Sequence, residues 1–243
     1  MSPWPAALLG AGAGAIAGSY IATLVQRWGR GEGASTGRSH CDGCGRTLGA
    51  SELVPLLSAA LSRGRCRTCN GRIDPLHWQT EALAALVGGT SLLIAPGLQG
   101  LALALLGWLL LPLALLDWRH FWLPDRLTLV LALAGLGAGQ WLGLAGWADR
   151  LAGGLAGFVA LQSIALLYRR LRGREGLGGG DPKLMGAIGL WLGWAALPVV
   201  LLAAAVIGLA AALPGGLQAT RRLPFGTMLG TAAWLVAAIA LVR

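Results

Sequence analysis

Two aspartates stand at the ends of long apolar stretches, where an ionisable side chain is unusual. Asp117 follows the apolar run of "LPLALLDWRHFWLPDRLTLV", and Asp181 follows the glycines of "REGLGGGDPKLMGAIG". Charged groups at or within a membrane span are costly, and by default they have a function or a partner. Two close carboxylates cannot both ionise easily, so one keeps a proton while the other acts as a base toward water. The pair Asp117 and Asp181 therefore predicts peptide hydrolysis by two carboxylates.

The residues around these acids leave some choices open. Asp125 lies close to Asp117 in the sequence and competes with it, but we assign Asp125 to the turn and to the start of the next span. The glycine run 178–180 is expected to allow close backbone approach and unusual dihedral angles where an extended substrate reaches Asp181. A glycine run before an acid also occurs in ordinary turns, so the run alone does not identify the chemistry.

All four cysteines lie in the one sizeable hydrophilic segment, residues 27–77. They form two CxxC pairs separated by 21 residues, which is close to the spacing of a four-cysteine zinc site. Gly45 and the pair Asn70–Gly71 suit the backbone reversal that such a knuckle needs. The alternative is a set of redox-active or idle thiols. In the cytoplasm thiols stay reduced, which favours metal ligands over disulfides. A zinc ion held by four thiolates would be structural, because no position is left open for water. The predicted ligands are Cys41, Cys44, Cys66 and Cys69.

Three further polar residues flank this segment. His40 and His77 could be ligands, but with four thiolates available we assign both histidines to solvated or interfacial positions. Glu81 has two interpretations. It could simply face the interface at a favourable helix N-terminus, or it could help to form a cofactor or substrate site.

The elements that position these residues are predicted to be membrane-spanning helices. Of 243 residues, 56% are hydrophobic and only 12% are charged, which is typical of a polytopic membrane protein. The first apolar stretch lacks a basic region before it and a cleavage site after it, so we expect it to remain as a helix. Pro198 is expected to divide one long stretch into two short helices, which makes about eight spans in an all-α fold. The predicted stretches are 4–26, 78–95, 98–117, 127–146, 150–168, 184–213 and 225–242.

The basic residues predict the orientation of these helices. Arginines concentrate in alternate connections, within 27–72, 119–126, 169–183 and 221–222, and short loops rich in Lys and Arg are retained in the cytoplasm. Both termini are then outside, and the two aspartates lie at the cytoplasmic interface. The net charge of +9 indicates a cytoplasmic face suited to anionic membrane lipid. No nucleic-acid partner is expected, because the basic residues are divided among loops without a recognisable binding module.

The motifs together resemble the type IV prepilin peptidases, the GxGD class of membrane aspartic proteases. The resemblance covers nearly the whole chain. It includes "GSY" at 18–20, "LVPLLS" and "RGRCRTCNGRI" in the cysteine segment, Glu81, Asp117 before "LPD", "GLGGGDPKLMGAIG", and "LPFG" at 223–226. The resemblance implies that Asp117 and Asp181 are catalytic, and that the position of Asp125 can hold asparagine in relatives.

The same resemblance implies a substrate and a cofactor. The substrates would be precursors of type IV pilins or of type II secretion pseudopilins, cleaved at the cytoplasmic face of the bacterial inner membrane. Family members with the cysteine loop often also methylate the new N-terminus with S-adenosylmethionine. This chain departs from the usual pattern at "IATLVQRWGR" (21–30) and "IDPLHWQTEA" (73–82). Peptide cleavage needs neither segment, whereas methyl transfer could.

The expected organisation is a first transmembrane helix (1–26), a cytoplasmic zinc-binding loop (27–77) and a transmembrane peptidase domain (78–243). Two other functions stay open. One is a proton-coupled transporter that uses Asp117 and Asp181 as a relay. The other is a peptidase without methyltransferase activity.

Overall fold

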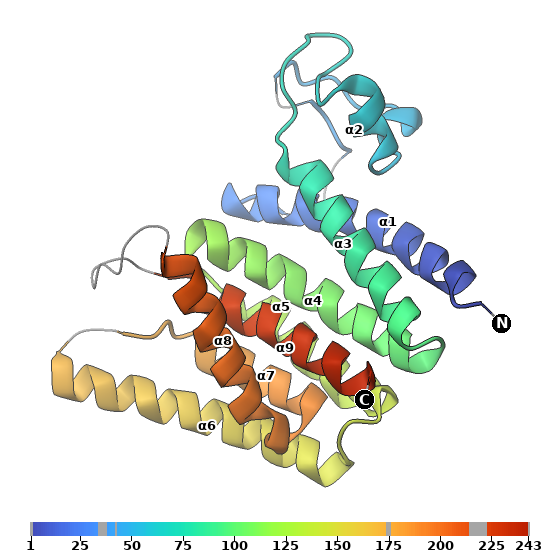
Figure 1. Cartoon of the computed structure of the whole chain (residues 1–243). Helices are drawn as coiled ribbons and strands as arrows, with labels where there is room; N and C mark the ends of the chain where they lie inside the picture. The colour runs from blue at the N-terminus through green and yellow to red at the C-terminus, as the bar shows by residue number, and fades with distance from the viewer. Residues whose placement is uncertain (1, 34–37, 42, 174–175, 214–222, 243) are drawn as a thin grey trace. The chain divides into compact units, whose positions relative to one another are not determined.

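The computed structural model describes residues 2–33, 38–41, 43–173, 176–213 and 223–242 (Figure 1). The described residues are mainly helical and contain no strand, apart from the isolated antiparallel bridges of His40 with Thr47 and of Arg65 with Arg72. The prediction of an all-α fold is therefore confirmed. The chain divides into two compact units, Met1–Leu93 and Ile94–Arg243.

The first unit contains two long helices, α1 (Trp4–Gly29) and α3 (Leu76–Ile94, whose last residue passes the unit boundary). Between them the chain forms the short 3-10 helix η1 (Ala50–Glu52) and the helix α2 (Leu57–Ser62). A Cβ added at Gly10, Gly14 or Gly18 of α1 would collide with the backbone of α3. Small residues thus let the two helices approach closely, as is common between helices in membranes. At Gly18 the close neighbour is Glu81.

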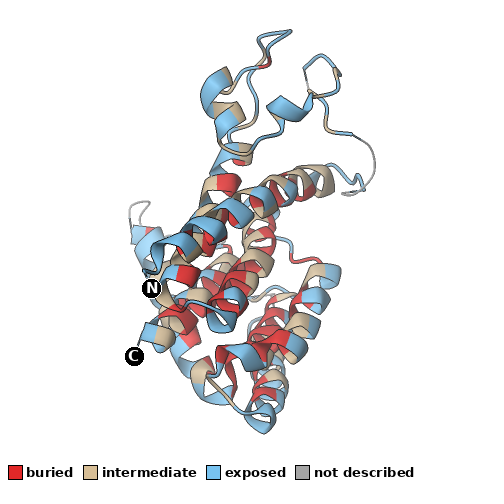
Figure 2. Ribbon diagram, turned by 90° about the vertical axis from the view of Figure 1, so that its right-hand side faces the viewer, coloured by how far each residue is buried: buried red, intermediate tan, exposed pale blue. Residues whose placement is uncertain are grey.

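The second unit is a helical bundle whose helices follow one another through short connections. Its core includes the fully buried Leu103, Leu113, Ile188, Trp191 and Leu229. The helix α7 packs against α5 and α6, and α9 packs against α4 and α8. Buried residues lie mainly on the faces that the helices turn toward one another (red in Figure 2). The helices are α4 (Leu98–His120), α5 (Asp125–Ala138), α6 (Trp147–Arg172), α7 (Asp181–Leu192), α8 (Leu197–Ala212) and α9 (Phe225–Val242), with the 3-10 segments η2 (Gly139–Leu142) and η3 (Trp194–Ala196).

Among the described residues, five helices are long and apolar enough to cross a membrane: α1, α4, α6, α8 together with η3, and α9. Of the other predicted spans, α5 and α7 hold only 14 and 12 residues, fewer than the roughly 20 that a bilayer requires. The five apolar helices indicate a multi-pass membrane protein, while the count of eight spans stays a prediction. The predicted basic connection at 221–222 lies outside the described residues.

The long apolar stretch 184–213 is divided, but at a different place from the one predicted. The chain reverses at Gly193, which has a φ of 80°, and Pro198 lies in the first turn of α8. Gly193 is needed there because a positive φ is unfavourable for other residues. Pro198 fits a first turn, where its missing N–H would have had no intrahelical partner.

The short helices α5 and α7 both end at the same buried arginine. Arg150 of α6 is 1% exposed. Its Nε donates to the carbonyl oxygen of Leu190 at 2.9 Å, and its Nη2 donates to those of Gly135 and of Leu136, the latter at 3.1 Å. The guanidinium therefore satisfies carbonyls at the C-terminal ends of both helices, where the helix dipole also favours a cation.

Candidate functional site

Asp117 is held by the start of a helix that lies far away in the sequence. It occupies the last turn of α4 and is 5% exposed. Its Oδ2 accepts the backbone N–H of Thr227 at 2.8 Å, and the Oγ1 of Thr227 lies 3.2 Å from the same oxygen. Thr227 belongs to the first turn of α9, whose N–H groups have no intrahelical acceptor. The α9 N-terminus therefore turns both a free donor and its positive dipole end toward the Asp117 carboxylate.

Asp181 is the first residue of α7 and is equally buried, at 5% exposed. Its Oδ2 accepts the backbone N–H of Gly178 at 2.9 Å. The charge of Asp117 acts on Asp181, so the structure brings the two carboxylates of the predicted pair into one electrostatic environment. Asp117 lies beside the N-terminus of α9 and Asp181 lies at the N-terminus of α7, and each position reduces the cost of a buried negative charge.

Leu123 packs against the segments that carry both aspartates. A Cβ at Gly180, the residue before Asp181, would lie 2.6 Å from the Cβ of Leu123. A Cβ at Gly226, the residue before Thr227, would lie 2.8 Å from Cδ1 of Leu123 and 3.1 Å from Oδ2 of Asp117. Leu123 is itself buried. Three segments that are distant in the sequence thus meet around one leucine side chain.

These contacts correct the expected role of the glycine run. None of Gly178, Gly179 and Gly180 has a positive φ, so the expectation of unusual dihedral angles is wrong. Two of the three glycines lie in close contact with a side chain, while the expected approach of a substrate stays a prediction. Gly180 makes room for Leu123, and a Cβ at Gly178 would lie 3.0 Å from Oδ2 of Asp181, whereas Gly179 faces open space.

Asp125 differs from both buried aspartates. It is the first residue of α5, and its side chain is 71% exposed. Its Oδ1 forms an ion pair with Nζ of Lys183 at 2.6 Å, and the Lys183 side chain is 46% exposed. The ion pair links the starts of α5 and α7 at the surface.

The four cysteines lie on two knuckles with the same backbone hydrogen bonds. In the first, the N–H of Cys41 donates to the oxygen of Arg46 at 2.9 Å, and Gly45 N–H donates to the oxygen of Cys41 at 2.8 Å. The second repeats this at Cys66, whose N–H donates to Gly71 at 2.9 Å and whose oxygen accepts Asn70 N–H at 3.0 Å. Gly45 and Asn70 have φ values of 69° and 55°, so the backbone reversals predicted there are confirmed.

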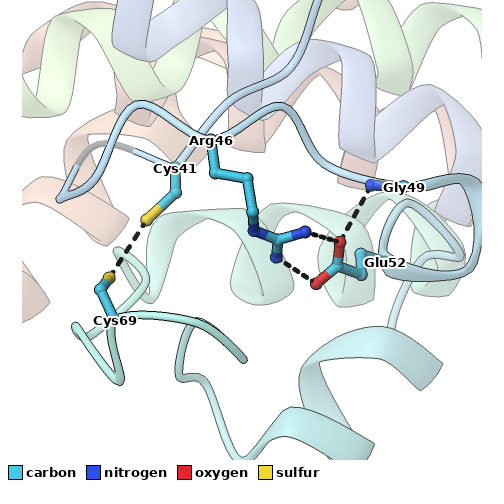
Figure 3. Close-up of polar contacts among 5 residues, drawn as sticks. All are labelled: Cys41, Arg46, Gly49, Glu52 and Cys69. Atoms are coloured by element: carbon cyan, nitrogen blue, oxygen red, sulfur yellow. Dashed lines mark hydrogen bonds and ion pairs between the residues drawn. The ribbon is translucent and has the colours of Figure 1, made fainter.

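The two knuckles bring all four sulfurs together. The Sγ atoms of Cys41, Cys44, Cys66 and Cys69 lie within 4.8 Å of one another, and those of Cys41 and Cys69 are 3.7 Å apart (Figure 3). Four sulfurs at the usual Zn–S distance around a tetrahedral ion are about 3.8 Å apart. The donor set and its spacing therefore fit a tetrahedral metal. The pKa of the Cys66 thiol is lowered to about 6 by hydrogen bonds from the backbone N–H groups of Cys69 and Thr68, which favours its thiolate. The pKa of the Cys69 thiol is raised to about 11, because the hydrogen bond from the backbone N–H of Gly71 is outweighed by the neighbouring thiols Cys66 and Cys44.

An ion pair braces the first knuckle (Figure 3). The guanidinium of Arg46 binds both carboxylate oxygens of Glu52, at 3.0 and 2.7 Å, and the N–H of Gly49 donates to Glu52 at 2.9 Å. The hydrogen bonds from Arg46 and from Gly49 lower the pKa of Glu52 to about 2. The pair links Arg46, two residues after the first CxxC, to η1, so the loop between the two knuckles has a defined path.

Glu81 lines a cavity of about 150 Å³ within the first unit. The carboxylate is buried, and its Oε2 accepts the N–H of Leu56 at 2.8 Å. His77 lines the same cavity, and its Nε2 lies 2.9 Å from Oε1 of Gln26. His40 is exposed, and neither histidine belongs to the four-cysteine cluster.

Sequence reasoning missed three residues of the site around the aspartates. Thr227, Gly226 and Leu123 contact the acids or the glycines beside them, but they carry no ionisable group. Gly226 ends the "LPFG" segment and Leu123 begins "LPD". Gly226 and Leu123 belong to these segments and Thr227 directly follows the first, but this says nothing about what the residues touch.

Comparison with protein families gives two matches along the chain. The model of the Type IV leader peptidase family matches residues 103–213. The model of the Bacterial Peptidase A24 N-terminal domain matches residues 13–94. The two matched segments correspond to the two compact units, with Asp117 and Asp181 in one and the four cysteines in the other.

Curated relatives named Prepilin leader peptidase/N-methyltransferase are similar over most of the chain, and three of them show the range. The protein from Aeromonas hydrophila is 38% identical over 203 residues, which cover 82% of this chain and 70% of the relative. That from Burkholderia pseudomallei is 43% identical over 199 residues, which cover 79% and 64%. That from Dichelobacter nodosus is 34% identical over 202 residues, which cover 81% and 69%. No solved structure matches the chain. On these similarities, the chain belongs to the type IV leader peptidase family.

Proposed function

We propose that this protein is a membrane aspartic endopeptidase that removes the basic leader from type IV prepilins or type II secretion pseudopilins, with Asp117 and Asp181 as its catalytic residues. The observation that carries the proposal is that two buried carboxylates, one on α4 and one on α7, lie beside glycines that both pack against Leu123, in a member of this family. Asp125, which is exposed and paired with Lys183, lacks the buried environment that the reaction needs.

The chemistry follows from one shared proton. The ionised carboxylate takes a proton from a water molecule while the water oxygen attacks the carbonyl carbon of the scissile peptide. The protonated carboxyl gives its proton to the carbonyl oxygen, which forms a neutral tetrahedral diol. When the diol collapses, the carboxyl that took the proton from water gives it to the leaving amine, the other carboxylate takes a proton from a diol hydroxyl, and the C–N bond breaks. Burial of both acids strengthens every electrostatic interaction with the developing charge.

The site is proposed to face the cytoplasm. Asp117 precedes Arg119 and His120 in the last turn of α4. The last turn of α6, which leads into the glycine segment before Asp181, holds Arg169, Arg170 and Arg172. Basic residues at these helix ends support the cytoplasmic side by the positive-inside rule, and they suit an anionic lipid surface.

The cysteine cluster is proposed to hold one structural zinc ion. Four thiolates complete a tetrahedral shell, so the ion would stabilise the loop rather than activate water. The two knuckles and the Arg46–Glu52 pair form a segment with little apolar core, and a metal supplies the missing stability in such small units.

Methylation of the new N-terminus is the second proposed activity, and the cavity around Glu81 supports it. S-Adenosylmethionine carries a sulfonium cation, an ammonium group and a carboxylate. The cavity offers acidic groups, Asp74 and Glu81, and arginines, Arg27 and Arg67, that suit these charges. The cofactor would supply the methyl group. Gln26 and His77, which contact each other in this cavity, lie in the two segments that depart from the usual family pattern.

The decisive experiment uses purified protein in detergent, without any ion gradient, and a prepilin with its leader. We expect a mobility shift from leader removal and, with S-adenosylmethionine present, an added methyl group on the mature N-terminus by mass spectrometry. A proton-coupled transporter would show no cleavage under these conditions. Cleavage without added methyl would leave the peptidase proposal intact and refute the methyltransferase one.

A further inference from the structure

Thr227 makes two different kinds of contact with the carboxylate of Asp117. Its backbone N–H donates to Oδ2 at 2.8 Å, and its hydroxyl oxygen lies 3.2 Å from the same Oδ2. The hydroxyl also lies 2.8 Å from the carbonyl oxygen of Ala114, one turn before Asp117 on α4. Thr227 is therefore the residue that joins the first turn of α9 to the last turn of α4 at the proposed catalytic acid.

The hydroxyl has one proton and two acceptors, so it can donate to only one of them at a time. When Asp117 is ionised, the hydroxyl donates to Oδ2, and this oxygen then accepts two hydrogen bonds. When Oδ2 carries a proton, the hydroxyl donates to Ala114 and accepts from Oδ2 instead. Both states satisfy every polar group with the same heavy-atom positions. A base that gains and loses a proton in each turnover needs such a partner, because no reorganisation is then required.

The two aspartates are supported unequally. Asp117 has the N–H and the hydroxyl of Thr227 on Oδ2, whereas Asp181 has the single N–H of Gly178 on its Oδ2. Hydrogen bonds donated to a carboxylate favour its ionised form. The unequal support assigns the ionised state to Asp117 and leaves the shared proton on Asp181.

We propose that Thr227 is a positioning residue that holds Asp117 as the ionised base of the pair and directs the other oxygen of Asp117, Oδ1, toward the attacking water. This proposal rests on the proposed peptidase function. Thr227 touches neither the water nor the peptide, so its loss affects the rate of the chemical step and not the binding of the prepilin.

The test compares kcat and KM for leader cleavage by purified variants in detergent. Thr227→Val keeps the size and the backbone N–H but removes the hydroxyl. We expect kcat to fall by about 10- to 100-fold, as for the loss of one hydrogen bond to a charged group, with KM within about twofold of wild type. Thr227→Ser restores the hydroxyl and should recover most of kcat.

Thr231→Val is the matched control, because it removes the same hydroxyl one turn further along α9, where Thr231 is exposed and donates only to the carbonyl oxygen of Thr227. It should leave kcat unchanged. Thermal unfolding in detergent reports the folding of each variant, and Thr227→Ala replaces Thr227→Val if the latter does not accumulate.

The outcomes separate this inference from the proposed function. If wild-type protein does not cleave prepilin, the proposed function fails. If wild-type protein cleaves and the hydroxyl-free variant keeps kcat within about threefold, or loses activity through KM alone, the role of Thr227 is overturned and the peptidase stands.

Discussion

The hydrogen bonds and the burial of the three candidate aspartates separate them at the scale of single residues. Asp117 and Asp181 are each 5% exposed and accept backbone N–H groups, whereas Asp125 is exposed and paired with Lys183. A surface ion pair of this kind contributes about 0–1 kcal/mol. A shared proton is expected in the buried surroundings of Asp117 and Asp181, but not at the exposed Asp125.

This difference predicts the effect of replacing each acid by asparagine, which is nearly isosteric but cannot ionise. Asp117→Asn or Asp181→Asn should lower leader cleavage by about 100- to 10,000-fold, because either the base or the proton donor is lost. Asp125→Asn should retain substantial activity. The assay is the mobility shift of a prepilin, with the membrane abundance of each variant measured in parallel.

The opposite pattern would contradict the assignment. Activity in Asp117→Asn together with an inactive Asp125→Asn would move the catalytic role to Asp125. Normal cleavage by both Asp117→Asn and Asp181→Asn would refute the aspartic-protease mechanism.

At the scale of elements, the site depends on how closely three segments approach one another. Leu123, at the start of "LPD", fills the space that side chains at Gly180 and Gly226 would occupy. The connection between α4 and α5 therefore helps to set the positions of the α7 and α9 N-termini, and with them the positions of both carboxylates.

Two neighbouring glycines give a matched test of this packing. Gly180→Ala places a Cβ 2.6 Å from that of Leu123, and the backbone beside Asp181 must shift. A displacement of about 1 Å at a catalytic group costs on the order of 100-fold in rate. Gly179→Ala meets nothing within 4 Å and should retain activity. Equal cleavage rates for the two alanine variants in purified protein would show that Leu123 does not constrain Asp181.

The same scale explains how α5 and α7, at 14 and 12 residues, can end inside a bundle. Arg150 donates to carbonyls near the C-terminal ends of both helices and stacks over Trp147, with 5.1 Å between the guanidinium carbon and the ring centre. Buried carbonyls that would otherwise lack partners are satisfied by one side chain. Asp125 begins α5 and Asp181 begins α7, so each of these acids lies on a helix whose C-terminal end is held by Arg150.

At the scale of the whole molecule, the cysteine cluster and the two buried aspartates belong to different compact units. Many large apolar side chains on the candidate membrane helices are exposed, including Leu155, Leu171 and Leu202, as expected for surfaces that lipid covers. The separation into units predicts that metal loss and loss of cleavage can be uncoupled.

Purified, reduced protein should contain about one zinc per chain by elemental analysis. Replacing Cys41 and Cys66 by serine should release the metal and unfold the loop, because structural zinc supplies about 10–16 kcal/mol in small zinc domains. A metal content near zero in wild-type protein would refute the zinc site. Brief chelation should leave leader cleavage within about twofold of the untreated protein, since the carboxylates and not the metal activate water. An immediate loss of cleavage that zinc restores would show that the two units are coupled.

The local pattern of the sequence was enough to predict the helical fold, the four-cysteine cluster and the candidate acids. Each of these predictions depends on the spacing of nearby residues or on the hydropathy of one segment. Both can be read directly from a continuous stretch of the sequence. The sequence also predicted the reversals at Gly45 and Asn70, because a knuckle is a local turn.

Only the tertiary structure decided what holds the acids. Thr227 contacts Asp117 across 110 positions of the chain, and Arg150 reaches Leu190 across 40. The role of the glycines before Asp181 changed for the same reason, since Gly180 makes room for Leu123 and has ordinary dihedral angles. Such contacts leave no periodic signal in a single sequence, because they arise from packing between segments whose separation along the chain is arbitrary.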